Sequence, residues 1–244
     1  MQKRSGPALL LGAIVVSLAA CALGVLAMAW TQGRLIRAYE LRQVLIASEA
    51  ALALPALLTA LALSKAFPEM ASFRPLPARG PLICVGLGLA LWGLSLGLFE
   101  AQYVLVRPPL EFLNQFQGLH DQLKPVGLAG WIFSITAIAL TPAFCEEIVF
   151  RGLLAPVFRR ALGTAAALVI SAGLFGLIHI DSMPDGTKVY YRVPFAFLLG
   201  VILAKVRFDS ESLWPPMIAH ATLNATTFVV VLLSDESIDT LPDP

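Results

Sequence analysis

Residues 127–157 read GLAGWIFSITAIALTPAFCEEIVFRGLLAPV, a long apolar run that contains the charged motif Cys145–Gly152 (CEEIVFRG). A run of this length predicts a membrane-spanning helix, because about 20 apolar residues cross the hydrocarbon core of a bilayer. Charged side chains near the bilayer centre cost at least ~2.5–3.5 kcal/mol each on insertion scales. The motif therefore predicts a polar site that is buried between helices and shielded from lipid.

The composition of the whole chain agrees with a membrane protein. The 244 residues are 58% hydrophobic and only 14% charged, whereas soluble domains are about 45–50% apolar and about 25% charged. The net charge of +1 gives no support for nucleic-acid binding. We expect a multi-pass integral membrane protein, with the lipid bilayer as its partner.

Apolar runs near bilayer length predict an all-α, polytopic transmembrane helical bundle of about seven spans. The runs lie at 7–30, 43–66, 81–106, 127–157, 161–180, 193–207 and 213–233. Between the third and fourth runs, residues 110–123 have the spacing of an amphipathic helix on the membrane surface. We divide the chain into N-terminal spans with this interfacial segment (1–126), a helical core that carries the polar motifs (127–233), and an acidic tail (234–244).

The first apolar run has two interpretations. Lys3 and Arg4 followed by apolar residues resemble a signal peptide, and Leu18–Cys21 resembles a lipoprotein cleavage box. However, the apolar stretch continues to Trp30, whereas the apolar region of a signal peptide is only about 7–15 residues long. A retained first span is the favoured interpretation.

Polar residues recur in three apolar segments that are far apart in the sequence. They are Glu146-Glu147-x-x-x-Arg151, Phe175-x-x-x-His179 and His220-x-x-x-Asn224. Two of the three histidines of the chain are in these segments.

Helical spacing separates the two carboxylates of the first motif. Glu147 and Arg151 are at positions i and i+4, so they share a helix face and can form an ion pair. Glu146 points about 100° away from Glu147, which predicts that Glu146 faces the bundle interior. Pro142, four residues before Glu146, is expected to kink this helix.

These residue types suit hydrolysis of a peptide bond inside the membrane. A carboxylate and an imidazole can hold a water molecule and take its proton. An imidazole and an amide can donate hydrogen bonds to the oxygen of a tetrahedral intermediate.

The order EExxxR, FxxxH and HxxxN on three apolar helices resembles the CPBP family, the Abi group of intramembrane proteases that includes the type II CAAX prenyl endopeptidases. The resemblance covers roughly residues 127–230. It implies that Glu146 and His179 activate the water, that His220 and Asn224 form the oxyanion hole, and that no cofactor is needed. It also implies that Glu147 and Arg151 form a structural pair and that Phe175 packs beside the site. With the resemblance we expect a protein or peptide substrate and a location in a prokaryotic cytoplasmic membrane.

Two other functions remain open at this stage. Glu146, His179 and His220 are the residue types of a His₂Glu zinc site, although no His-Glu-x-x-His motif occurs. A non-catalytic protein, such as an immunity protein, a scaffold or a proton-coupled transporter, could also contain buried carboxylates and histidines. Neither the substrate nor the oligomeric state can be read from the sequence.

Overall fold

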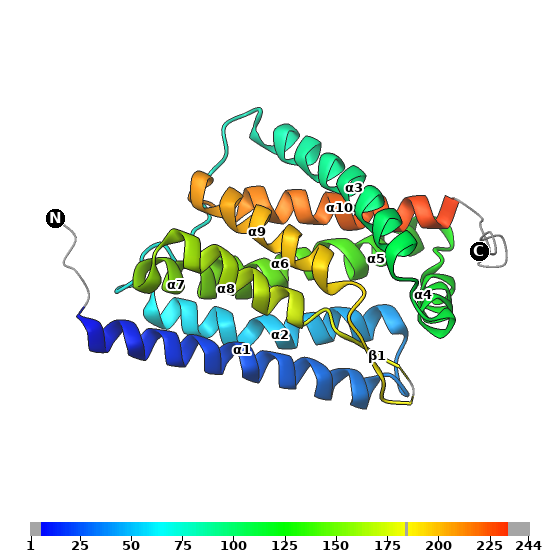
Figure 1. The fold of residues 1–244 in the computed structure, drawn as a ribbon, viewed down its shortest axis with the longest axis horizontal. Coiled ribbons are helices and arrows are strands. Elements are labelled where there is room, and N and C mark those ends of the chain that lie inside the picture. The colour runs from blue at the N-terminus through cyan, green and yellow to red at the C-terminus, as the bar shows by residue number, and fades with distance from the viewer. Residues whose placement is uncertain (1–5, 184, 234–244) are drawn as a thin grey trace.

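The computed structural model describes residues 6–183 and 185–233, and it consists almost wholly of helices (Figure 1). The elements are α1 (Pro7–Leu35), α2 (Leu41–Leu63), α3 (Gly80–Leu105), α4 (Leu110–Leu123), α5 (Gly127–Ile135), η1 (Thr136–Leu140), α6 (Thr141–Glu147), η2 (Ile148–Leu154), α7 (Ala155–Leu162), α8 (Thr164–Leu177), β1 (Asp181–Ser182), β2 (Lys188–Val189), α9 (Val193–Ser210) and α10 (Trp214–Leu233). The predicted all-α class is confirmed, with one two-residue antiparallel hairpin, β1–β2, as the exception. The predicted acidic tail lies outside the described residues.

Five helices in the described part of the chain are long and apolar enough to cross a membrane. They are Pro7–Leu35, Leu41–Leu63, Gly80–Leu105, Gly127–Leu162 and Trp214–Leu233. The protein is an integral membrane protein, but the predicted count of seven spans is not confirmed. The run at 161–180 forms only the 14-residue α8, which is roughly 21 Å long at ~1.5 Å per residue, short of a core of about 30 Å. The run at 193–207 forms α9, whose last turns contain Lys205, Arg207 and Asp209.

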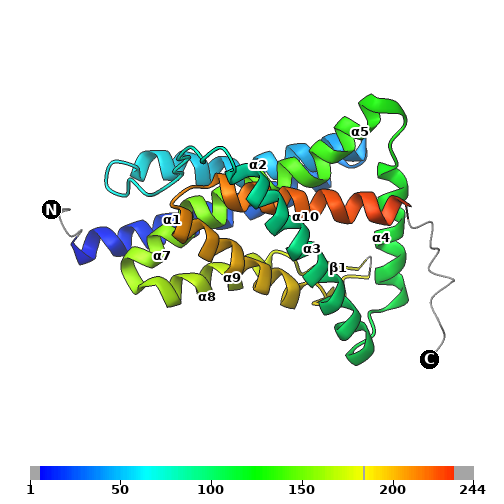
Figure 2. The same ribbon diagram turned by 90° about the horizontal axis from the view of Figure 1, so that it is seen from above.

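α1, α2 and α10 run along the long axis of the molecule, and α3 crosses them obliquely (Figures 1 and 2). α1 packs against α2, α8 against α9, and α3 against α10. The predicted helix at 110–123 is present as α4, which lies across one end of the bundle at a steep angle to the long helices (Figure 2).

Glycines allow close helix contacts at two of these crossings. A Cβ atom at Gly88 on α3 would lie 2.5 Å from Cβ of Thr222 and 2.6 Å from the carbonyl oxygen of Ala219, both on α10. A Cβ atom at Gly200 on α9 would lie 2.9 Å from Cα of Ala172 on α8. Membrane helices have little hydrophobic force to bring them together, so small residues and close packing hold them instead.

The helix at Gly127–Leu162 is interrupted by two π-helical segments, η1 and η2. Each segment ends two residues before a proline, Pro142 or Pro156. Proline has no backbone N–H and clashes with the carbonyl four residues earlier, so the regular hydrogen-bond ladder cannot continue there. Pro156 has no N–H to donate to the Gly152 carbonyl four residues earlier. This carbonyl instead accepts a hydrogen bond of 3.1 Å from the N–H of Ala71. The disruption expected at Pro142 is thus a π-helical segment next to the charged motif.

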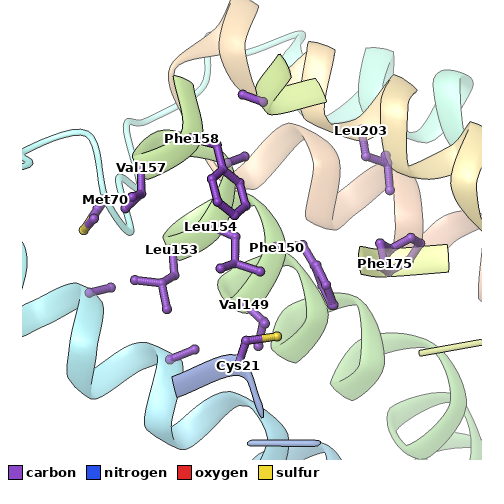
Figure 3. Close-up of a cluster of buried hydrophobic side chains, with 14 of the residues drawn as sticks. Cys21, Met70, Val149, Phe150, Leu153, Leu154, Val157, Phe158, Phe175 and Leu203 are labelled. Atoms are coloured by element: carbon purple, nitrogen blue, oxygen red, sulfur yellow. The ribbon is translucent and has the colours of Figure 1, made fainter. Parts of the chain in front are cut away.

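The η2 segment forms the centre of the main apolar core. Val149 and Phe150 are fully buried, and the Phe150 ring faces Phe175 of α8 with ring centroids 5.1 Å apart (Figure 3). Cys21 of α1 belongs to the same buried cluster (Figure 3). Because Glu147 and Arg151 flank Val149 and Phe150 in the sequence, this core also fixes the charged motif.

A smaller apolar cluster joins α4 to the hairpin. Phe112 of α4 is buried with Met183 and Val189, and its ring lies 5.8 Å from that of Tyr191. The hairpin follows His179 directly in the sequence, so this cluster anchors the chain on one side of the polar motifs.

Candidate functional site

Glu147 and Arg151 form the ion pair that their spacing predicts. Arg151 Nη1 lies 2.7 Å from Glu147 Oε1, and the two side chains are 1% and 0% exposed. Arg151 Nη2 donates a further hydrogen bond of 3.2 Å to the Gly200 carbonyl of α9, and the guanidinium lies 4.4 Å from the centroid of the Phe175 ring. Arg151 therefore ties three helical segments together at one buried point, which is the arrangement that a buried charge requires.

His220 lies between the two adjacent carboxylates. Its Nδ1 is 3.1 Å from Glu147 Oε1, and its Nε2 is 3.8 Å from Glu146 Oε2. The side chain is only 3% exposed. The spacing of the motif did not reveal the contact with Glu147, because 73 residues separate the partners. Glu147 is therefore more than the partner of Arg151, since it also orients an imidazole.

Glu146 faces the interior, as its position beside Glu147 predicts. The residue is 8% exposed, and its Oε2 atom is buried without a hydrogen-bond partner in the described part of the chain. A buried carboxylate oxygen without a partner is costly. The atom is thus free to bind a water molecule or a substrate group beside His220.

His179 lies in the turn that follows α8, whereas the sequence predicted a helical position. Its Nδ1 lies 2.8 Å from the Phe175 carbonyl oxygen, so Nδ1–H donates this hydrogen bond. In the neutral imidazole, Nε2 is then the nitrogen that accepts a proton.

Phe175 contacts both imidazoles and thereby brings the second and third motifs together. Its ring centroid is 4.7 Å from that of His179 and 6.0 Å from that of His220. Phe175 is fully buried. The same ring packs against Phe150, so it lies between the imidazoles and the apolar core.

Asn224 follows His220 by one helical turn on α10 and is half-buried. No hydrogen bond joins its amide to any other described residue. The structure thus joins Glu146, Glu147, Arg151, Phe175, His179 and His220 by direct contacts, and Asn224 only by its place on α10.

An apolar cavity of about 380 Å³ lies between α10 and the segment formed by η1 and α6. Its lining residues are Leu140, Thr141, Ala143, Phe144, Trp214, Met217, Ile218 and Ala221. Phe144 precedes Glu146 by two residues, and Met217 and Ala221 flank His220 on α10. The cavity is therefore lined by the same two segments, α6 and α10, that carry Glu146 and His220.

The residue set for a zinc site does not come together as a ligand group. Among the described residues, no three His, Cys, Asp or Glu side chains are placed to hold a metal ion. The Nδ1 atoms of both imidazoles contact other groups. That of His179 lies against the backbone carbonyl of Phe175, and that of His220 lies against the Glu147 carboxylate.

Residues 128–226 match the family model described as type II CAAX prenyl endopeptidase Rce1-like. This match covers all three polar motifs and confirms the family resemblance that they predicted. No curated protein and no solved structure matches the chain.

Proposed function

We propose, from the match of residues 128–226 to the type II CAAX prenyl endopeptidase Rce1-like family model, that the protein is an intramembrane endopeptidase of membrane-associated or prenylated proteins and peptides. The observation that carries the proposal is the Glu146 carboxylate. Its Oε2 atom is buried without a partner, 3.8 Å from His220 Nε2. Such a carboxylate in an apolar bundle has the position of a general base.

In the proposed reaction, Glu146 and His179 bind the nucleophilic water. Glu146 takes a proton from this water while the water oxygen bonds to the scissile carbonyl carbon. The C–N bond then breaks, and the leaving nitrogen receives the proton that Glu146 accepted. The free Nε2 of His179 supports this role, because it can accept a hydrogen bond from the same water.

We assign the oxyanion to His220 and Asn224. When both ring nitrogens of His220 carry protons, Glu147 accepts the Nδ1–H hydrogen bond and Nε2–H is the donor available to the oxyanion. This is the relation of carboxylate and imidazole in serine protease triads, where the carboxylate orients the ring and stabilises its charge. Glu147 then has two functions, because the same oxygen also binds Arg151.

The apolar cavity beside α10 is the proposed route for the apolar part of the substrate. Its lining residues Met217 and Ala221 are on α10, the helix that carries His220. Binding pockets are mostly apolar with a few convergent polar groups, and this description fits the cavity together with the polar cluster.

The test compares cleavage by the full chain and its variants in proteoliposomes. The substrates are a farnesylated peptide, the same peptide without lipid, and an unrelated membrane-spanning peptide. We expect Glu146→Gln and His179→Ala to lower kcat by a factor of about 10² or more, the lower end for a general base. Glu100→Gln, an exposed site on α3, is the control that should retain full activity.

The alternatives give different results in the same assay. If cleavage survives both site substitutions, the proposed mechanism is wrong. If a chelator abolishes wild-type cleavage and Zn²⁺ restores it, the zinc mechanism replaces the metal-free one. If the wild-type protein cleaves none of the three substrates, the non-catalytic alternatives gain support.

A further inference from the structure

Three aromatic rings meet at one edge of the apolar cavity. Phe144 of α6 and Trp214, the first residue of α10, both line the cavity. Phe73, in the connection between α2 and α3, contacts both of these rings. Its centroid lies 6.3 Å from that of Phe144, in a stacked arrangement, and 5.3 Å from that of Trp214, edge to face. We call these three rings the aromatic rim. Phe73 is outside the three polar motifs and outside the matched residues 128–226.

The lining of the cavity suits a hydrocarbon group. Apart from the Thr141 hydroxyl and the indole N–H of Trp214, its side chains carry no polar hydrogen-bonding group. A water molecule needs two to four polar partners to stay in a cavity, and this lining does not supply them. Hydrocarbon loses nothing in such a place, so the cavity of about 380 Å³ fits an apolar chain.

The rim sets one end of this cavity. Along α10 the lining runs from Trp214 to Ala221, which is roughly 10 Å at ~1.5 Å per residue. Ala221 is next to His220 in the sequence. A substrate that places its scissile bond at His220 would therefore lay an attached apolar chain along this lining, and the chain would meet the rim after roughly 10 Å.

The segment that carries Phe73 is held by its backbone rather than by its ring. The Ser72 carbonyl accepts a hydrogen bond of 2.9 Å from the N–H of Leu213. The Arg74 carbonyl accepts one of 2.8 Å from the Ser212 hydroxyl. Both bonds join the connection to the turn before α10, on either side of Phe73. Phe73 itself is 37% exposed, so its ring contributes less to the core than a buried ring would. The backbone thus fixes a ring whose contacts are at the edge of the cavity.

We propose that Phe73 is a specificity-determining residue that limits the length of the hydrocarbon group bound in the cavity. A short group fits between His220 and the rim. A longer group has to displace the Phe73 ring from Phe144 and Trp214, and forcing extra methylene groups into a packed site is unfavourable. The inference rests on the proposed function, because it requires the cavity to hold the apolar part of the substrate.

The test compares kcat/KM of the full chain in proteoliposomes for one cysteine-containing peptide that carries an S-octyl, S-dodecyl or S-hexadecyl chain. We expect the wild-type protein to favour the octyl peptide over the hexadecyl peptide. Phe73→Ala should raise the hexadecyl-to-octyl ratio about tenfold, as expected when one overpacked contact is relieved. Partition of each peptide into the bilayer is the same for both proteins and cancels in this comparison.

Two variants serve as controls. Phe73→Tyr keeps the ring and should keep the wild-type ratio. Tyr39→Ala removes an exposed ring from the connection between α1 and α2 and should also leave the ratio unchanged. Each ratio compares two substrates of one preparation, so partial loss of folded protein does not alter it.

The outcomes separate this inference from the proposed function. If Phe73→Ala keeps the wild-type ratio or lowers cleavage of all three peptides equally, the rings are an anchor at the membrane interface, a common position of aromatic residues, and the inference is overturned. A wild-type protein that does not distinguish the chain lengths, or a Phe73→Tyr protein that behaves like Phe73→Ala, overturns it as well. In each of these cases the proposed function stands if Glu146→Gln abolishes cleavage. If Glu146→Gln cleaves at the wild-type rate, or if the wild-type protein cleaves none of the peptides, both proposals fail.

Discussion

Glu147 is the residue on which the polar cluster depends most. One of its oxygens accepts hydrogen bonds from Arg151 and from His220. The residue is fully buried, so water cannot replace either partner when one is removed. The charge of Glu147 therefore has to be balanced from within the protein, and Arg151 is the cation in contact with it.

Removal of Arg151 should destabilise the fold. Arg151→Ala leaves Glu147 buried without its cation, and breaking a buried pair in this way costs ~3–5 kcal/mol. We expect a lower unfolding midpoint in detergent and less protein in the membrane. Arg37→Ala, at an exposed position after α1, is the matched control and should behave as the wild type. Equal stability of the two variants would contradict the structural role of the pair.

The pairing of Glu147 with Arg151 could be predicted from the sequence because both residues are on one helix at a fixed spacing. The contact of Glu147 with His220 could not, because it depends on how α6 packs against α10. Local geometry is encoded within a few residues, whereas the site is assembled by packing between segments.

At the scale of elements, the apolar runs predicted where helices lie better than how regular or how long they are. The runs at 127–157 and 161–180 both form helices, but the first contains two π-helical segments and the second ends at Leu177. Hydropathy does not report the hydrogen-bond register that prolines disturb. It also does not report where the chain turns. The position of His179 beyond the end of α8 could therefore not be predicted from it.

The crossing of α3 and α10 should be sensitive to a single methyl group. Gly88→Ala would place Cβ against the Ala219 carbonyl and Thr222, which flank His220 in the sequence. Overpacking of this kind costs typically 1–3 kcal/mol, and the displacement of α10 should also lower kcat. Gly93→Ala on the same helix is the control, because nothing lies within 4 Å of its added Cβ. Thermal unfolding and cleavage rates of the two variants check the prediction, and a Gly88→Ala protein as stable and active as Gly93→Ala would contradict it.

For the whole molecule, the long axis of the bundle is the natural direction of the membrane normal. The candidate spans α1, α2 and α10 follow this axis, α3 runs obliquely to it, and α4 lies across one end of it (Figures 1 and 2). The hairpin lies at the same end as α4, and the connection between α2 and α3 lies at the opposite end (Figures 1 and 2). The composition predicted a membrane bundle, but it could not show which connections share a face, because that depends on the tertiary arrangement.

Labelling with a membrane-impermeant maleimide checks this arrangement. Gln117→Cys on α4 and Asp185→Cys in the hairpin are at exposed positions near one end, and Lys65→Cys, directly after α2, is exposed near the other (Figures 1 and 2). We expect the first two to react from one side of sealed vesicles and the third only from the other side. The native Cys21, Cys84 and Cys145 are 6–8% exposed, so the unaltered protein should give a low background. If Asp185→Cys and Lys65→Cys reacted from the same side, the long axis would not be the membrane normal, and the depth at which Glu146 and His220 lie would have to be reassigned.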